Sequence, residues 1–293
     1  MRIPSGLAVL LVCGKLPRVK LMPVCGGMRL RAGDLPEATM TSRFCIVIFT
    51  PIAMLGLGAR AANPPKPAPV PPYEGTGDLK IDRPEDKVDV KPNPAPQGAI
   101  VLFNGKDVSD WRNASGKEPA KWEVIGGVLQ VKPGTGNILT QHQFDGAYKL
   151  HVEFRIPYEP NNKGQRRGNS GVYVNSHWEV QVLDAYHNEA NAIEACGAIE
   201  SIEAARENVA KAPTIWQSYD MEFHPAKCEG GKVVQRPTLN VVWNGVEVHH
   251  NTKLTRDVTP GGHGGDICKP GPVMLQDHGH PVQFRNIWAE PLK

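Results

Sequence analysis

The stretch Tyr148-Lys149-Leu150-His151-Val152-Glu153-Phe154-Arg155-Ile156 decides the fold class of this chain. Apolar and polar side chains alternate along it without interruption, which is the period of a β-strand that buries one face. We expect Leu150, Val152, Phe154 and Ile156 to point into a core and the other set to point away from it. A half-buried strand of this kind belongs to a sheet that packs against a second layer.

Similar short runs occur on both sides of this stretch, separated by Gly, Pro and Asn. They cover residues 122–131 with a turn at Gly126-Gly127, 171–175, 178–182, 239–243 with a turn at Asn244-Gly245, and 282–288. Such turns between alternating runs are typical of hairpins. One helix is expected over 202–211, between Ser201 as N-cap and Pro213 as terminator. The sequence therefore predicts an all-β fold, an antiparallel β-sandwich with one short helical insertion.

Composition and charge exclude two classes of protein. The chain has 293 residues, of which 40% are hydrophobic and 22% charged, and no apolar run reaches 18 residues outside the N-terminal region. A polytopic membrane protein is excluded on that ground. Residues 1–61 carry eight Lys or Arg and two acidic residues, so the net charge of +3 becomes −3 without them. This balance gives no electrostatic reason to expect a nucleic-acid partner.

Residues 1–61 read as a signal or targeting region. Met40-Thr-Ser-Arg43 provides a positive start, residues 44–57 are apolar, and Ala59-Arg60-Ala61 fits a cleavage site that gives a mature start near Ala62. On this interpretation Met40 is the true initiator. The alternatives are one long targeting region over 1–61 and a buried strand at 44–57. We expect an exported protein, periplasmic or extracellular, that meets a membrane only through an uncleaved targeting segment.

Residues 62–97 contain ten prolines and read as a Pro-rich linker that leads into a domain at 98–293. Three cysteines remain beyond the targeting region: Cys196, Cys228 and Cys268. An oxidising compartment permits one disulfide among them and one free thiol, and the sequence does not choose the pair. No C-x-x-C or H-E-x-x-H spacing assigns metal ligands. Calcium is the one cofactor considered, through the oxygens of Asp184, Asp277 or Glu179.

Alternation also defines a polar face. If residues 148–156, 171–175 and 177–182 are neighbours in one sheet, that face combines aromatic, amide and charged side chains, among them Arg155, Tyr173, Asn175, Glu179 and Gln181. This mixture is typical of a carbohydrate groove, and a plain solvated face is the alternative. A bulge after Gln181 would bring Asp184 to the same face. Sandwich glycosidases use such a bulge to bring two carboxylates together.

Two loops contain histidines that could belong to the same site. His278 lies in the turn Leu275-Gln-Asp-His-Gly279, where polar residues cluster, and is a candidate for catalysis or substrate contact. His263 lies in Gly261-Gly-His-Gly-Gly265, a loop that could cover a site.

Six motifs in order resemble the 3-keto-disaccharide hydrolase family. They are Leu102–Trp111, Trp122–Val124, Gly168–Tyr173, Glu179–Asp184, Val241–Gly245, and Leu275–Gly279 together with Phe284–Ile287. The resemblance covers residues 100–293 and implies a concanavalin-A-like jelly roll that acts on glycosides whose C3 hydroxyl is oxidised to a ketone. A C3 ketone acidifies the C2 proton, so a base can remove it, the C1 substituent can leave by elimination, and water can then add.

The resemblance and the residue types together give a set of candidate site residues. Those for catalysis are Glu179, Asp184 and His278, and those for substrate binding are Arg155, Asn169, Tyr173, Gln181, Gln276 and Arg285. Glu179 or His278 is the base by hypothesis, Arg155 or a bound cation stabilises the enolate, and Asp184 orients or protonates.

The chain departs from the family pattern after Cys196-Gly-Ala-Ile199, where an aromatic residue is expected and Glu200-Ser201 follow. We therefore expect residues 189–211 to reshape one wall of the groove. Two functional alternatives remain beside the 3-keto-glycoside hydrolase: a non-catalytic carbohydrate-binding or structural jelly roll, and an ordinary glycoside hydrolase that uses Glu179 and Asp184.

Overall fold

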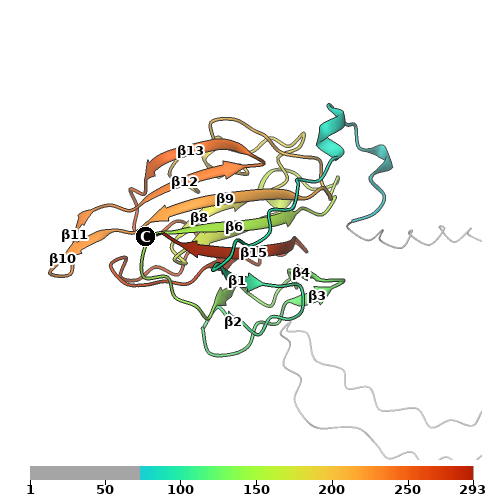
Figure 1. The fold of residues 1–293 in the computed structure, drawn as a ribbon. Coiled ribbons are helices and arrows are strands. Elements are labelled where there is room, and N and C mark those ends of the chain that lie inside the picture. Colours follow the sequence, from blue (N-terminus) through green and yellow to red (C-terminus); the bar gives the residue numbers. More distant parts are fainter. Residues whose placement is uncertain (1–72, 293) are drawn as a thin grey trace, which may run out of the picture. The chain divides into compact units, whose positions relative to one another are not determined.

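Two antiparallel sheets enclose one hydrophobic core in the computed structural model, which describes residues 73–292 (Figure 1). The eight-stranded sheet has the order β13-β12-β9-β6-β15-β4-β3, with β1 paired to β15. The five-stranded sheet has the order β2-β5-β14-β7-β8, and β10 and β11 form a separate hairpin. This is the predicted antiparallel β-sandwich.

The strands of the eight-stranded sheet are β1 (Ile100–Phe103), β3 (Glu123–Ile125), β4 (Val128–Gln130), β6 (Tyr148–Arg155), β9 (Gln217–His224), β12 (Thr238–Trp243), β13 (Val246–Lys253) and β15 (Gln283–Pro291). Those of the five-stranded sheet are β2 (Trp111–Asn113), β5 (Ile138–Thr140), β7 (Ser170–Val174), β8 (Trp178–Val182) and β14 (Met274–Leu275). The separate hairpin consists of β10 (Lys227–Glu229) and β11 (Lys232–Gln235).

The expected strand pattern and turns are confirmed. Leu150, Val152 and Phe154 of β6 lie in the core and are no more than 1% exposed. The hairpin β3–β4 turns at Gly126-Gly127 and β12–β13 turns at Asn244-Gly245, and all four turn residues have positive φ. Glycine and asparagine adopt this conformation at little cost, which explains why they stand at these turns.

β6 is not a neighbour of β7 and β8 in one sheet, so the condition for a polar face shared by the three strands is not met. β6 lies between β9 and β15 in the eight-stranded sheet, whereas β7 and β8 pair in the five-stranded sheet. Val152 on β6 and Val172 on β7 both enter the shared core. The polar sets of the two strands therefore point to opposite outer faces of the sandwich, because each lies on the side of its sheet away from the core.

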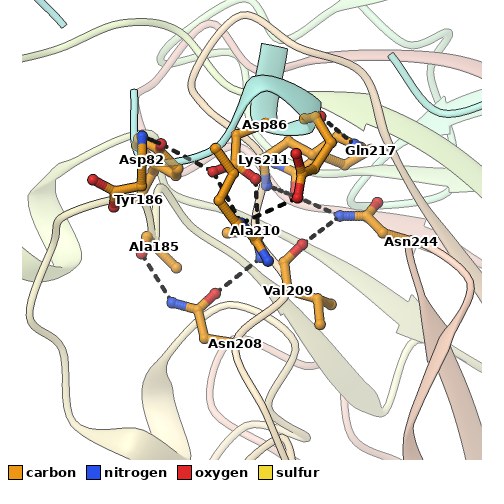
Figure 2. A network of polar contacts seen from close by, with 12 residues as sticks. Asp82, Asp86, Ala185, Tyr186, Asn208, Val209, Ala210, Lys211, Gln217 and Asn244 are labelled. Atoms are coloured by element: carbon orange, nitrogen blue, oxygen red, sulfur yellow. Dashed lines mark hydrogen bonds and ion pairs between the residues drawn. The ribbon is translucent and has the colours of Figure 1, made fainter. Parts of the chain in front are cut away.

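The helix expected over 202–211 is wrong. Its backbone and side chains bond to distant segments, as Figure 2 shows: Asn208 Nδ2 donates to Ala185 O (3.1 Å), and Val209 O accepts from Asn244 Nδ2 (2.8 Å). Lys211 N likewise donates to Gln217 Oε1 at 3.1 Å. These tertiary contacts outweigh local helix propensity. In the described part of the chain the only helical elements are 3₁₀ turns: η1 (Thr76–Asp78), η2 (Pro84–Lys87), η3 (Gly164–Arg166) and η4 (Ala192–Glu194).

The N-terminal segment, defined here as residues 73–99, is bonded to the sandwich and is not a free spacer. Figure 1 shows it crossing the eight-stranded sheet, where Val90 N donates to Trp216 O at 3.1 Å and Trp288 Nε1 donates to Asn93 O at 2.9 Å. Tyr186 OH donates to Asp86 Oδ2 at 3.1 Å (Figure 2). The rest of the expected linker, residues 62–72, and the expected targeting region 1–61 lie outside the described residues.

A disulfide joins Cys228 of β10 to Cys268, which the sequence left open, and Cys196 is a buried free thiol. No helix within residues 73–292 has the length and apolar character that a membrane crossing requires.

Candidate functional site

The hairpin β7–β8 forms the base of the candidate site. Its turn lies at Asn175-Ser176, and the register opposes Tyr173 to Glu179 and Gly171 to Gln181. Val172 and Val180 enter the core, so the opposed polar pairs lie together on the outer face of the five-stranded sheet. All ten strand residues are nevertheless buried, because loops cover that face.

Glu179 is the central residue of this face. Its Oε2 accepts a hydrogen bond from Tyr173 OH at 2.5 Å, and its backbone N donates to Thr259 Oγ1 at 3.0 Å. Its Oε1 is buried without a partner among residues 73–292. Burial raises the pKa of Glu179 to about 8; the hydrogen bond from Tyr173 opposes this shift and the charge of Glu200 adds to it.

Gly171 makes room for this carboxyl group. A Cβ at position 171 would lie 1.9 Å from Glu179 Oε1 and 2.7 Å from its Cδ, well inside van der Waals contact. Any residue other than glycine at position 171 would displace the carboxyl group of Glu179 from its observed position.

Three amide side chains add to this polar face, Gln276 through its contact with Tyr173, and Asn169 and Gln181 through their contacts with Gln165. Gln276 Nε2 donates to Tyr173 OH at 2.8 Å, Asn169 Nδ2 donates to Gln165 Oε1 at 2.8 Å, and Gln181 Nε2 lies 3.5 Å from the same Gln165 oxygen. Each of the three amides keeps a buried carbonyl oxygen that has no partner in the described chain. Together with Glu179 Oε1 these oxygens form a set of buried acceptors that hydroxyl donors of a sugar would satisfy.

Glu200 supplies a second carboxyl group that sequence reasoning did not include among the site residues. Residues 197–200 run antiparallel to β8: Val180 pairs with Ile199, and Glu200 N donates to Glu179 O at 3.0 Å. Glu200 Oε2 lies 3.4 Å from Gln181 Nε2. Burial raises the pKa of Glu200, and the charge of Glu194 adds to this effect. The only signal in the sequence was the departure from the family pattern at this position.

A glycine-rich loop, residues 259–265, covers the cluster. Pro260 O accepts from Tyr173 OH at 2.9 Å, and His263 N donates to Ser176 O at 2.8 Å. Gly261 lies so close that a Cβ there would be 2.5 Å from Tyr173 OH. The expectation that this loop covers a site agrees with its position.

Five of the nine candidate site residues therefore lie together: Asn169, Tyr173, Glu179, Gln181 and Gln276. The other four lie elsewhere: Arg155, Asp184, His278 and Arg285.

Asp184 does not join Glu179, because β8 ends at Val182 without the expected bulge. Its Oδ2 accepts from Arg167 Nε at 2.7 Å and its Oδ1 from Tyr186 N at 3.0 Å, so the carboxylate closes the loop after β8. Burial raises the pKa of Asp184 to about 6 although Arg167 lowers it. His278 is exposed on the turn after β14, and no hydrogen bond ties it to Glu179 in the described residues.

Arg155 and Arg285 lie on the outer face of the opposite sheet. Both guanidinium groups stack on Trp216, at 4.8 Å and 4.1 Å from its ring centroid, and Arg285 Nε donates to Glu153 Oε2 at 2.6 Å. They fail as site residues because alternation places side chains on a face but does not say to which sheet the strand belongs.

A metal centre built from side chains of His, Cys, Asp or Glu is not found within residues 73–292: no three of them are grouped suitably. The oxygens considered for calcium are separated accordingly, with Asp184 bound to Arg167 and Asp277 accepting from Gly136 N at 2.9 Å.

The fold and this site define a jelly-roll protein with a buried carboxyl and amide cluster on the outer face of the smaller sheet. A model of the 3-keto-alpha-glucoside-1,2-lyase-like domain matches residues 98–290. The chain belongs to this family, which confirms the resemblance seen in its motifs.

One solved structure agrees with this assignment, and a second is reported beside it. A candidate glycosyl hydrolase of Parabacteroides distasonis is 34% identical, with a TM-score of 0.61, over 68% of this chain and 86% of that one. Another from the same organism is 19% identical, with a TM-score of 0.49, over 67% of this chain and 94% of that one. No curated protein matches the chain.

Proposed function

We propose that this chain is an exported carbohydrate-active enzyme that cleaves glycosides carrying a ketone at C3. Membership in the 3-keto-alpha-glucoside-1,2-lyase-like family and the 34% identity to a candidate glycosyl hydrolase support a carbohydrate-active, hydrolase-like function. The disulfide between Cys228 and Cys268 supports export, because such bonds persist mainly in oxidising compartments.

The environment of Glu179 is the observation that carries the proposed reaction. A carboxyl group with a pKa near 8 is a much stronger base than an exposed glutamate once it is ionised, and a useful fraction is ionised at neutral pH. Its Oε1 is free to accept a proton, while Tyr173 holds Oε2 in place. The site is thus suited to removing a weakly acidic C–H proton.

In the proposed reaction the Glu179 carboxylate takes the proton from C2, and the C–H electron pair forms the enolate with the C3 carbonyl. The enolate then restores the ketone as a C1–C2 double bond forms and the C1–O bond breaks. The leaving oxygen departs with its electron pair and takes from Glu179 the proton that was removed from C2. Addition of water at C1 completes a formal hydrolysis. Glu179 is the only base that this sequence requires.

A neutral donor, and not Arg155, is assigned to the enolate oxygen. Gln276 supplies an N–H group within the cluster besides the one that it donates to Tyr173 OH. Tyr173 gives its own O–H to Glu179, and Arg155 stacks on Trp216 on the other sheet. Donors fixed in a buried site stabilise developing negative charge without reorganisation. The acceptor oxygens of Asn169, Gln181 and Gln276 are assigned to sugar hydroxyls.

The test compares release of sugar from a 3-keto-glucoside and from its unoxidised parent. Wild type is expected to cleave the keto substrate alone, with kcat/KM rising as pH increases through about 8, because the base must be ionised. Glu179→Gln should reduce kcat/KM by at least about a hundredfold, the scale of a lost general base. Glu123→Gln is the matched control, since Glu123 pairs with Lys132 on the other sheet.

Other outcomes would replace the proposal. Cleavage of both substrates would indicate ordinary glycosidase chemistry. Binding of the keto substrate by wild type without cleavage would indicate a carbohydrate-binding module of the same fold.

A further inference from the structure

Glu179 and Glu200 are directly opposed on adjacent backbone segments. Val180 and Ile199 form an antiparallel bridge, with Glu200 N donating to Glu179 O and Gln181 N to Ala198 O (2.9 Å). This register places residue 179 opposite residue 200. Because Val180 and Ile199 both enter the core, the two glutamate side chains point to the same outer face.

Neither carboxyl group has a positive partner. Glu179 and Glu200 are 2% and 8% exposed, and no ion pair to either occurs within residues 73–292. Their hydrogen bonds come from neutral groups: Tyr173 OH to Glu179, and Gln181 Nε2 and Ser201 Oγ (3.3 Å) to Glu200. The titratable groups of the elements packed against the pair are Tyr173 from β7, Tyr219 from β9, Glu194 from η4 and His263 from the covering loop. His263 is the one potential cation among them; its charge acts on His177, and it forms no ion pair with either glutamate in the described part of the chain.

Two buried carboxyl groups in this arrangement oppose each other's ionisation, since removing both protons would leave two uncompensated negative charges side by side. The unpartnered Oε1 of Glu179 and the unpartnered amide oxygen of Gln181 add further negative potential. One proton retained by the pair relieves this repulsion.

We propose that Glu179 and Glu200 hold one proton between them at neutral pH, and that Glu200 acts as a positioning residue that keeps Glu179 a strong base. The charge of Glu200 is one of the causes that raise the pKa of Glu179, which agrees with this arrangement, while burial and the charge of Glu194 raise the pKa of Glu200. The catalytic consequence rests on the proposed function, whereas the shared proton is a property of the free protein. The pair therefore titrates in two coupled steps, in the manner of other carboxyl dyads.

Carboxyl ¹³C NMR of the unliganded full chain, labelled at glutamate, tests the pair directly. In wild type one step is expected at or above pH 7. In Glu200→Gln the midpoint of Glu179 should fall by at least about one pH unit, a tenfold loss of proton affinity. Glu179→Gln should lower the midpoint of Glu200 in the same way. The control is Glu203→Gln, because Glu203 lies on the same segment but bonds to His249 and Thr252.

Activity gives a second readout. In Glu200→Gln the rise of kcat/KM with pH on a 3-keto-glucoside should move to lower pH, a change that loss of packing would not produce. If the titration midpoint of the remaining glutamate is unchanged in both Glu200→Gln and Glu179→Gln, the proposal that the two groups share a proton is wrong. A wild type that titrates as expected but leaves the keto substrate intact would overturn the proposed function and leave the pair standing.

Discussion

At the scale of single residues, the site depends on one position that has no side chain. Gly171 has extended backbone geometry that alanine could also adopt, since it is not among the glycines with positive φ. Its constraint is spatial, because the volume that a methyl group would fill is occupied by the carboxyl group of Glu179. The glycine thus serves the site and not the turn chemistry of the hairpin.

Gly171→Ala should therefore inactivate the protein while leaving it folded. The added Cβ would displace the flexible end of Glu179, and a displacement of about 1 Å costs on the order of a hundredfold in rate. Circular dichroism should be unchanged while kcat/KM falls by that factor. Gly146→Ala is the matched control, since a Cβ there meets nothing within 4 Å. Equal activity of the two variants would contradict the assignment.

Sequence reasoning placed side chains on a common face wherever this follows from alternation alone. Tyr173, Glu179 and Gln181 alternate with buried valines, so their shared face is readable from the chain. Arg155 alternates equally well, but its strand belongs to the other sheet, which depends on long-range pairing. Glu200 lies on a segment too short to show any period, and only the backbone bonds to β8 bring it to the site.

At the scale of elements, the covering loop is attached at two places. Residues 259–265 contact the site through Pro260 and Gly261, and a few residues later Cys268 is joined to Cys228 of the β10–β11 hairpin. The cross-link spans a sequence separation of 40 and limits the freedom of the loop in the unfolded chain.

The double variant Cys228→Ser, Cys268→Ser should lose about 4 kcal/mol of unfolding free energy in the chain-entropy model. Thermal melts with and without reductant measure this loss. Reduced wild type should have the same Tm as the variant. Reductant should not change the Tm of the variant, because Cys196 is the one remaining thiol among the described cysteines and is buried. If the variant has the same Tm as oxidised wild type, the disulfide does not stabilise the fold.

At the scale of the whole described molecule, the folded unit is larger than the family domain. The family match begins at residue 98, yet the N-terminal segment before it packs on the sandwich. Its own Asp86 is buried, and its Asn93 accepts a hydrogen bond from the indole of Trp288. The carboxyl group of Glu153 on β6 and the backbone oxygen of Trp216, just before β9, also accept hydrogen bonds from this segment.

A chain that begins at residue 98 should be markedly less stable than one that begins at residue 73. Loss of several kcal/mol of contacts should lower Tm by about 10 °C or more, since each kcal/mol corresponds to about 2–4 °C for domains of 150–250 residues. Exposure of Trp216 and Trp288 should also shift tryptophan emission to the red. Equal melting temperatures would show that the segment is dispensable.

The glycine at position 171 also provides a way to classify related protein sequences. Family members that carry alanine or serine at the equivalent of Gly171 would retain the fold but could not hold the carboxyl group in place. Such paralogues are expected to have lost turnover, and those that persist would do so through sugar binding alone. A single alignment column could thus separate the family's enzymes from its lectin-like descendants.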